Sequence, residues 1–147
     1  MRFMMMVKAN KDSEAGVLPS KELFAAMGKF NEEMAKAGVL LAAEGLQPSS
    51  KGVRVRDSGG ERTAVRGPFH DTKELVAGYW MIQTKSIEEA IDWAMRCPNP
   101  MGEGMDSEIE IRPIYEASDF PPDVFSPEEA AREQRLRDEM ERKAAKP

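Results

Sequence analysis

The chain has 147 residues, 41% of them hydrophobic, and a formal net charge of −5. This length and composition predict one globular domain with an appendage. The negative charge and the absence of a Lys/Arg cluster argue against nucleic-acid binding, because a phosphate backbone requires concentrated positive charge. The apolar run at residues 3–7 is too short for a membrane span and polar residues follow it, so it predicts a strand and not a signal peptide. We therefore expect a cytoplasmic protein without a membrane partner.

Sulfur-containing side chains give no indication of a metal or a cofactor. Cys97, the single cysteine, cannot form an internal disulfide and has no Cys or His at metal-ligand spacing. The eleven methionines predict core packing, because thioethers fill irregular gaps and seven of them fall where core residues are expected. These seven are Met4, Met5, Met6, Met27, Met34, Met81 and Met95.

The first third of the chain predicts a strand, a helix and a strand. Residues 2–8 form the first strand, and Pro19 and Ser20 open a helix. Its apolar residues are four, three and four apart, which places them on one face; they are Leu23, Met27, Phe30 and Met34. Gly38 is a typical left-handed stop after the last turn, and residues 39–46 read as a buried strand.

The middle of the chain predicts a hairpin, a strand, a helix and a strand. Apolar and basic residues alternate from residue 53, residues 58–60 form a turn and residues 62–66 return. A strand follows at residues 76–84, and Ser86 with Glu89 forms a capping box. The helix after it has an apolar face with helical spacing, predicted from Ile87, Ala90, Ile91, Ala94 and Met95. The last strand lies within residues 108–115.

This order predicts an α+β fold with a ferredoxin-like antiparallel sheet, because burying two amphipathic helices requires one common sheet face. The central strands are apolar on both sides, so the other face also requires a cover. A second subunit is the simplest cover, and we expect a homodimer.

Composition changes after Tyr115, so we divide the chain into a domain at residues 1–117 and a linker with a charged helix at residues 118–147. Ser126, Pro127 and Glu129 supply the start signals of a helix that extends to about Ala144. Its few apolar residues, chiefly Leu136 and Met140, allow two interpretations: a solvated helix stabilised by i,i+4 ion pairs, or a helix docked across the dimer.

Residues 66–82 read RGPFHDTKELVAGYWMI and carry the most specific pattern of the chain. The Gly67-Pro68-Phe69 turn, the acidic segment at residues 71–74 and Gly78-Tyr79 resemble, in this order, the signature of the YCII-related (DGPF-domain) family. Further matches lie at residues 38–41, 44–48 and 110–113. The resemblance extends from Met1 to about Phe120 and implies a dimeric α+β barrel.

The catalytic residues of that family do not carry over. The resemblance implies an acidic residue opening the signature and a histidine in the N-terminal half, whereas this chain has Arg66 at the first position and no histidine before His70. Asp71 and His70 are the remaining catalytic candidates. Imidazole suits acid–base chemistry near neutral pH, but adjacent residues in a loop usually point apart, so the alternative is a surface histidine.

Charged side chains inside or beside apolar strands indicate a binding site. Glu44 and Arg112 are costly to bury unless they pair with each other or contact a ligand. In the first alternative they form a mutual ion pair between strands. In the second they line a polar cleft together with further polar residues of the signature, namely Arg66, Asp71, Lys73 and Tyr79.

Two functions are consistent with these residues. The first is a homodimer that binds a small polar or anionic molecule in the cleft, with acid–base catalysis as an extension. The second is a non-enzymatic accessory or interaction module linked to sigma-factor-type transcription regulation, which the resemblance implies because DGPF-family genes often accompany genes for such factors.

Overall fold

The computed structural model describes residues 1–145 of the chain, which forms two compact units, Met1–Ile114 and Tyr115–Pro147. Each unit is described by itself. The first contains the sheet, the hairpin and the signature residues, and the second contains the charged C-terminal helix.

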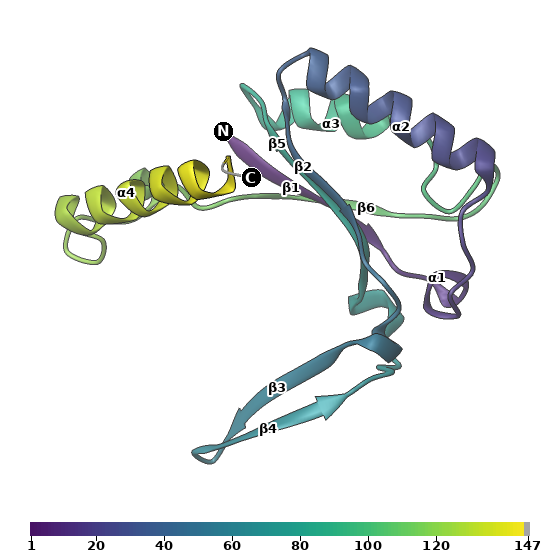
Figure 1. The fold of residues 1–147 in the computed structure, drawn as a ribbon, viewed down its shortest axis with the longest axis horizontal. Helices are drawn as coiled ribbons and strands as arrows, with labels where there is room; N and C mark the ends of the chain where they lie inside the picture. The colour runs from purple at the N-terminus through teal and green to yellow at the C-terminus, as the bar shows by residue number, and fades with distance from the viewer. Residues whose placement is uncertain (146–147) are drawn as a thin grey trace. The chain divides into compact units, whose positions relative to one another are not determined.

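A four-stranded antiparallel sheet organises the first unit (Figure 1). Its strands are β1 (Arg2–Lys8), β2 (Leu40–Gly45), β5 (Val76–Gln83) and β6 (Ile109–Pro113). The strand order β2-β5-β1-β6 places the first strand and the third core strand in the centre. This is the ferredoxin-like order that the sequence predicted.

Both long helices of this unit lie on one face of the sheet: α2 (Lys21–Lys36) and α3 (Ile87–Arg96), with the short α1 (Lys11–Glu14) preceding them (Figure 1). Three aromatic rings join the layers. Phe30 of α2 lies edge-on to Trp80 of β5, with 6.0 Å between centroids, and 6.3 Å from Trp93 of α3. The odd-numbered residues of β1 complete the core, at Phe3, Met5 and Val7.

Capping side chains define where the helices begin and end. Ser20 accepts a hydrogen bond from the Leu23 amide, and Gly38, at φ 75°, follows the last turn of α2. Ser86 caps α3 in the same way, by accepting from the Glu89 amide, while the Glu89 carboxylate accepts from the Lys85 amide.

The buried face of α3 differs from the predicted one. Ala90 and Trp93 are buried, whereas Met95 is 81% exposed, and Ile87 and Ile91 are also exposed. Apolar residues cover more than half of this short helix, so spacing alone does not decide which side packs. The large ring of Trp93 reaches Phe30, so the side with Trp93, Ala90 and Ala94 packs on the core and the side with Met95 does not.

The methionines of the sheet and of α2 lie in two environments, the core and the opposite face of the sheet. Met5 and Met34 are fully buried, as expected, while Met4, Met6 and Met81 are half-buried on the face of the sheet opposite α2 and α3. Alternation along β1 explains this division, because successive side chains of a strand point to opposite faces.

The hairpin arm, β3 (Val53–Ser58) and β4 (Glu61–Arg66), forms a separate two-stranded sheet and leads away from the four-stranded sheet in Figure 1. Gly59 and Gly60 connect its strands at φ 58° and 85°, the conformation of a tight hairpin turn. Two short 3-10 helices flank the arm along the chain, η1 (Ser49–Lys51) and η2 (Thr72–Glu74).

The second unit contains the short η3 (Ala117–Asp119) and the long α4 (Pro127–Ala144). Ser126 caps α4, and ion pairs one turn apart follow its surface, including Arg137–Glu133 at 2.6 Å and Lys143–Glu139 at 3.0 Å. The rings of Tyr115, Phe120 and Phe125 pack in series before the helix. The predicted charged helix is confirmed. Within residues 1–145, no helix is long and apolar enough to cross a bilayer.

Truncation of Trp93 tests which face of α3 is buried. We expect Trp93→Ala to lower the free energy of unfolding by about 3–5 kcal/mol, because it leaves a cavity against Phe30. Met95→Ala, on the exposed side of the same turn, should change it by less than about 0.5 kcal/mol. Urea denaturation of both variants measures the difference, and equal losses would contradict this packing.

Candidate functional site

The signature turn, residues 67–74, packs against η1 through a close backbone approach. A Cβ on Gly67 would lie 1.9 Å from the Ser49 carbonyl oxygen, so this position excludes every residue with a side chain. The Gly67–Pro68 peptide bond is cis. The Ser49 hydroxyl accepts a hydrogen bond from the Phe69 amide at 2.9 Å. The close approach that the sequence indicated for Gly67 is therefore present.

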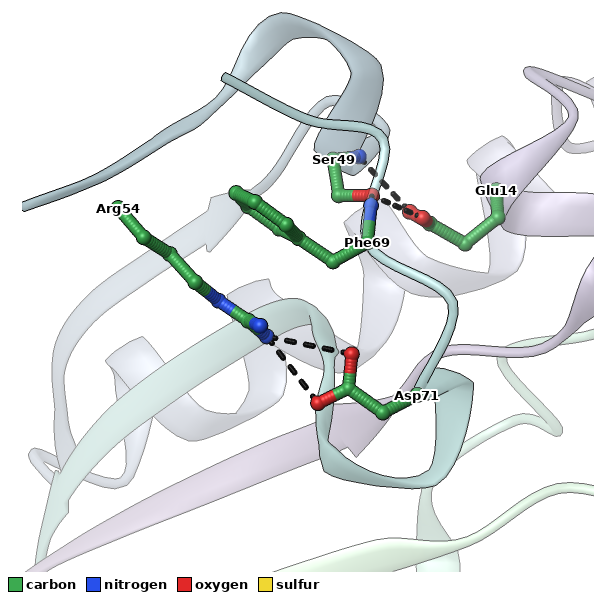
Figure 2. A network of polar contacts seen from close by, with 5 residues as sticks. All are labelled: Glu14, Ser49, Arg54, Phe69 and Asp71. Atoms are coloured by element: carbon green, nitrogen blue, oxygen red, sulfur yellow. Dashed lines mark hydrogen bonds and ion pairs between the residues drawn. The ribbon is translucent and has the colours of Figure 1, made fainter. Parts of the chain in front are cut away.

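The Glu14 carboxylate holds Ser49 in position (Figure 2). Its carboxylate accepts one hydrogen bond from the Ser49 amide at 2.8 Å and a second from the Ser49 hydroxyl. Glu14 is the last residue of α1, which the sequence interpretation did not predict. This carboxylate therefore connects the segment after β1 to the signature turn.

Arg54 connects the hairpin arm to the same turn (Figure 2). Its guanidinium forms an ion pair with Asp71, with 3.2 Å between Nη2 and Oδ2, and lies 3.9 Å from the centroid of the Phe69 ring. The sequence interpretation missed Arg54 because it alternates with valines and reads as one residue of the hairpin's wet face. The signal available in the sequence was the positive charge of Arg54, which can pair with the acidic turn.

Asp71 is thus engaged with Arg54. Glu74 also hydrogen-bonds to Asp71, and this bond, ahead of backbone hydrogen bonding and Arg54, lowers the pKa of Asp71. The same bond, with the negative charge of Asp71, raises the pKa of Glu74. Of the two carboxyl groups, Glu74 therefore takes up a proton more readily than Asp71 as the pH falls.

His70 and Lys73 are both exposed, in contrast to the half-buried Asp71. Exposure of His70 agrees with the surface alternative for this residue. Among residues 1–145, no three Asp, Glu, His or Cys side chains are grouped as a metal site requires.

Glu44, Tyr79 and Arg112 lie on the face of the sheet opposite α2 and α3, which we call the open face. Cross-strand register places its side chains in two rows. One row contains Glu44, Tyr79, Met6 and Glu110, and the next contains Ala42, Met81, Met4 and Arg112. Each row has an apolar centre, and the first has a carboxylate at both ends.

Glu44 and Arg112 do not form the ion pair that the sequence allowed. They lie on the opposite edge strands β2 and β6, roughly 14 Å apart across three strand spacings. Arg112 pairs instead with Glu110 of its own strand at 3.4 Å. Both are exposed, so the expected cost of burying them does not arise.

The site residues apart from Arg66 therefore fall into two groups. Glu44 and Tyr79 are direct neighbours on the open face, with Arg112 at its far edge. Asp71 and Glu74 lie in the signature turn, which joins the sheet where Lys8 pairs with Val76. Arg66 lies at the base of the hairpin arm, opposite Val53. The turn is thus a structural junction beside the open face.

An antiparallel sheet with two helices on one face and a polar-edged second face defines an α+β protein of the ferredoxin-like class. A model of the YCII-related domain matches residues 1–118, and the chain belongs to this family. The resemblance of the signature is therefore confirmed.

Two individual proteins are similar to the chain. The uncharacterized protein R00369 of Rhizobium meliloti (strain 1021) is 30% identical over 101 residues, which cover 69% of this chain and 78% of that protein. The structure of 5-chloro-2-hydroxyhydroquinone dehydrochlorinase (TftG) from Burkholderia phenoliruptrix AC1100, in complex with 2,5-dihydroxybenzoquinone, aligns at 11% identity with a TM-score of 0.45. That alignment covers 82% of this chain and all of the other.

Substitution of Gly67 tests the junction between the turn and η1. We expect Gly67→Ala to destabilise the fold by about 1–3 kcal/mol, because the new methyl group must displace the Ser49 carbonyl. Gly28→Ala is the control: Gly28 lies inside α2 with open space around it, and alanine should stabilise the protein by about 0.5–1 kcal/mol. Two substitutions with effects of the same sign and size would contradict the assignment.

The interaction of Asp71 with Glu74 is testable by NMR titration of the carboxyl carbons. We expect Asp71→Asn to lower the pKa of Glu74 toward its ordinary value, because the charge and hydrogen bond that raise it are removed. Asp57→Asn, at the far end of the hairpin arm, should leave Glu74 unchanged. A pKa of Glu74 that is unaffected by Asp71→Asn would show that the two groups do not interact.

Proposed function

We propose that the protein is a homodimer that binds a small polar or anionic molecule at the open face. The observation that carries the proposal is the composition of this face, where half-buried Met6 and Tyr79 lie between Glu44 and Glu110. An apolar floor with a few polar groups at its edges is the usual lining of a small-molecule site.

The same face supports the proposed dimer. Met4, Met6 and Met81 are half-buried in a layer that neither α2 nor α3 covers. Burial of apolar side chains stabilises an association by about 25 cal/mol per Å², so a second copy placed over this layer would gain from its methionines. Two facing sheets would enclose the polar groups at the edges of each face in one cleft.

The charges of the open face define the ligand class. Arg112 supplies a guanidinium for a carboxylate or phosphate, although Glu110 already neutralises part of its charge. Glu44 and the Tyr79 hydroxyl supply an acceptor and a donor on the other side. A molecule with a negative group at one end and hydroxyl or amino groups at the other matches this arrangement.

Binding is better supported than catalysis. Asp71 is ion-paired with Arg54 and His70 is exposed, so neither has the geometry of a prepared acid or base. We therefore propose a binding site and assign no reaction step to these residues.

A thermal-shift screen against metabolites tests the proposal. A ligand at a hundredfold over its Kd should add about 2.7 kcal/mol to the free energy of unfolding. We expect Glu44→Gln and Arg112→Gln to abolish the shift, because they remove the polar ends of the open face. Glu88→Gln, on α3, is the matched control and should retain it.

The absence of a shift from every compound would contradict the binding proposal and favour an accessory or interaction module. A shift that survives both open-face substitutions would show that the ligand binds elsewhere.

A further inference from the structure

The hairpin arm carries an apolar surface that the rest of the unit leaves exposed. Val53, Val55 and Ala64 share one side of the ribbon, with Arg66 at its base, since Val53 pairs with Arg66 and Val55 with Ala64. Val55 is 65% exposed and Val53 46% exposed, and every residue of β4 is exposed. Isolated two-stranded hairpins are marginally stable in water, so an arm with this composition gains from a partner surface.

The opposite side of the ribbon has a different role. Arg54 and Val65 lie there at the base, where Arg54 contacts Phe69 and Asp71 (Figure 2). Arg56 and Thr63 continue this side toward the tip. Contact with the signature turn therefore orients the arm and leaves the valine side available.

Charge favours a second copy of this chain as the partner. Residues 51–66 contain five Lys or Arg and two Asp or Glu, a net charge of +3. The other residues of the first unit, 1–50 and 67–114, contain ten Lys or Arg and fifteen Asp or Glu, a net charge of −5. The positively charged arm of one copy is therefore attracted to the negatively charged remainder of the first unit in another copy. A nucleic acid would use the cations but would leave the valines in water.

The geometry points to a homodimer in which the arm of each copy extends over the partner and lays Val53, Val55 and Ala64 against the rim of the partner's open face. This inference rests on the proposed homodimer and adds the arm to its interface. Each cleft would then be completed by the other copy, with the arm closing the end near Tyr79 and Glu44.

The dimensions limit what the arm contributes. Six residues per strand give an arm about 20 Å long and, with two strands, about 10 Å wide. Each arm then covers roughly 200 Å² on each surface, and two arms bury roughly 800 Å² in total. This is below the about 1,200 Å² typical of stable interfaces, so the facing sheets must supply the remainder. Loss of the arm should weaken the dimer without abolishing it.

Site-specific photo-crosslinking tests the inference. A benzophenone amino acid replaces Val55 in the full chain, and two differently tagged copies are mixed before irradiation. We expect a covalent dimer that contains both tags, with the crosslink mapping to β2 or β5, the strands that carry Glu44 and Tyr79. The probe at Thr63, on the opposite side of the ribbon, is the matched control and should give no dimer.

Sedimentation equilibrium of Val55→Glu, without any probe or ligand, gives an independent readout. We expect the dimer Kd to rise at least tenfold, while Thr63→Glu leaves it within about twofold. A dimeric wild type with no crosslink from Val55, or equal effects of the two substitutions, would overturn the arm inference and leave the proposed dimer intact. A monomeric wild type would overturn both, and crosslinking of Val55 to duplex DNA alone would assign the arm to a nucleic acid.

Discussion

Packing of α2 and α3 on one face of the sheet through Phe30, Trp80 and Trp93 is the constraint on which the rest of the structure depends. These rings fix which face of the sheet is buried. Because side chains alternate between the two faces, this also determines which residues of β1 and β5 point to the other face. Met4, Met6, Tyr79 and Met81 are placed there for this reason and not by any local preference. The open face is thus a consequence of the core.

A second set of contacts controls the hairpin arm. Glu14 accepts a hydrogen bond from the Ser49 amide, and the Ser49 hydroxyl accepts one from the Phe69 amide. The Phe69 ring and the Asp71 carboxylate both contact the Arg54 guanidinium. Each contact is a hydrogen bond, an ion pair or a cation–π contact at a partly exposed position, so each contributes modestly by itself. Together they fix the direction of the arm relative to the turn. The signature of the YCII-related family therefore has a structural role in this chain, because Gly67 permits the approach that brings these groups together.

The sequence predicted the elements and their order well, because caps, turn glycines and periodicity act locally. Ser20, Gly38 and Gly59-Gly60 mark boundaries by their own chemistry. It predicted the face of α3 incorrectly, since Trp93 and Met95 are both apolar and the choice between them depends on Phe30, 63 residues away along the chain. One of its two interpretations paired Glu44 with Arg112 because both interrupt apolar strands, and strand order, which separates them, is not a local property. Arg54 was missed for the same reason: its partner Asp71 is brought to it by the turn.

Methionine oxidation offers the most direct test of the central claim, that the open face is covered by a second copy. Dilute hydrogen peroxide is applied over a range of protein concentrations, and the oxidation of each methionine is followed by mass spectrometry. The account predicts that Met95, 81% exposed on α3, reacts quickly at every concentration, whereas Met4, Met6 and Met81 react slowly in concentrated solution and faster on dilution. Oxidation of these three methionines at a rate independent of concentration would contradict it.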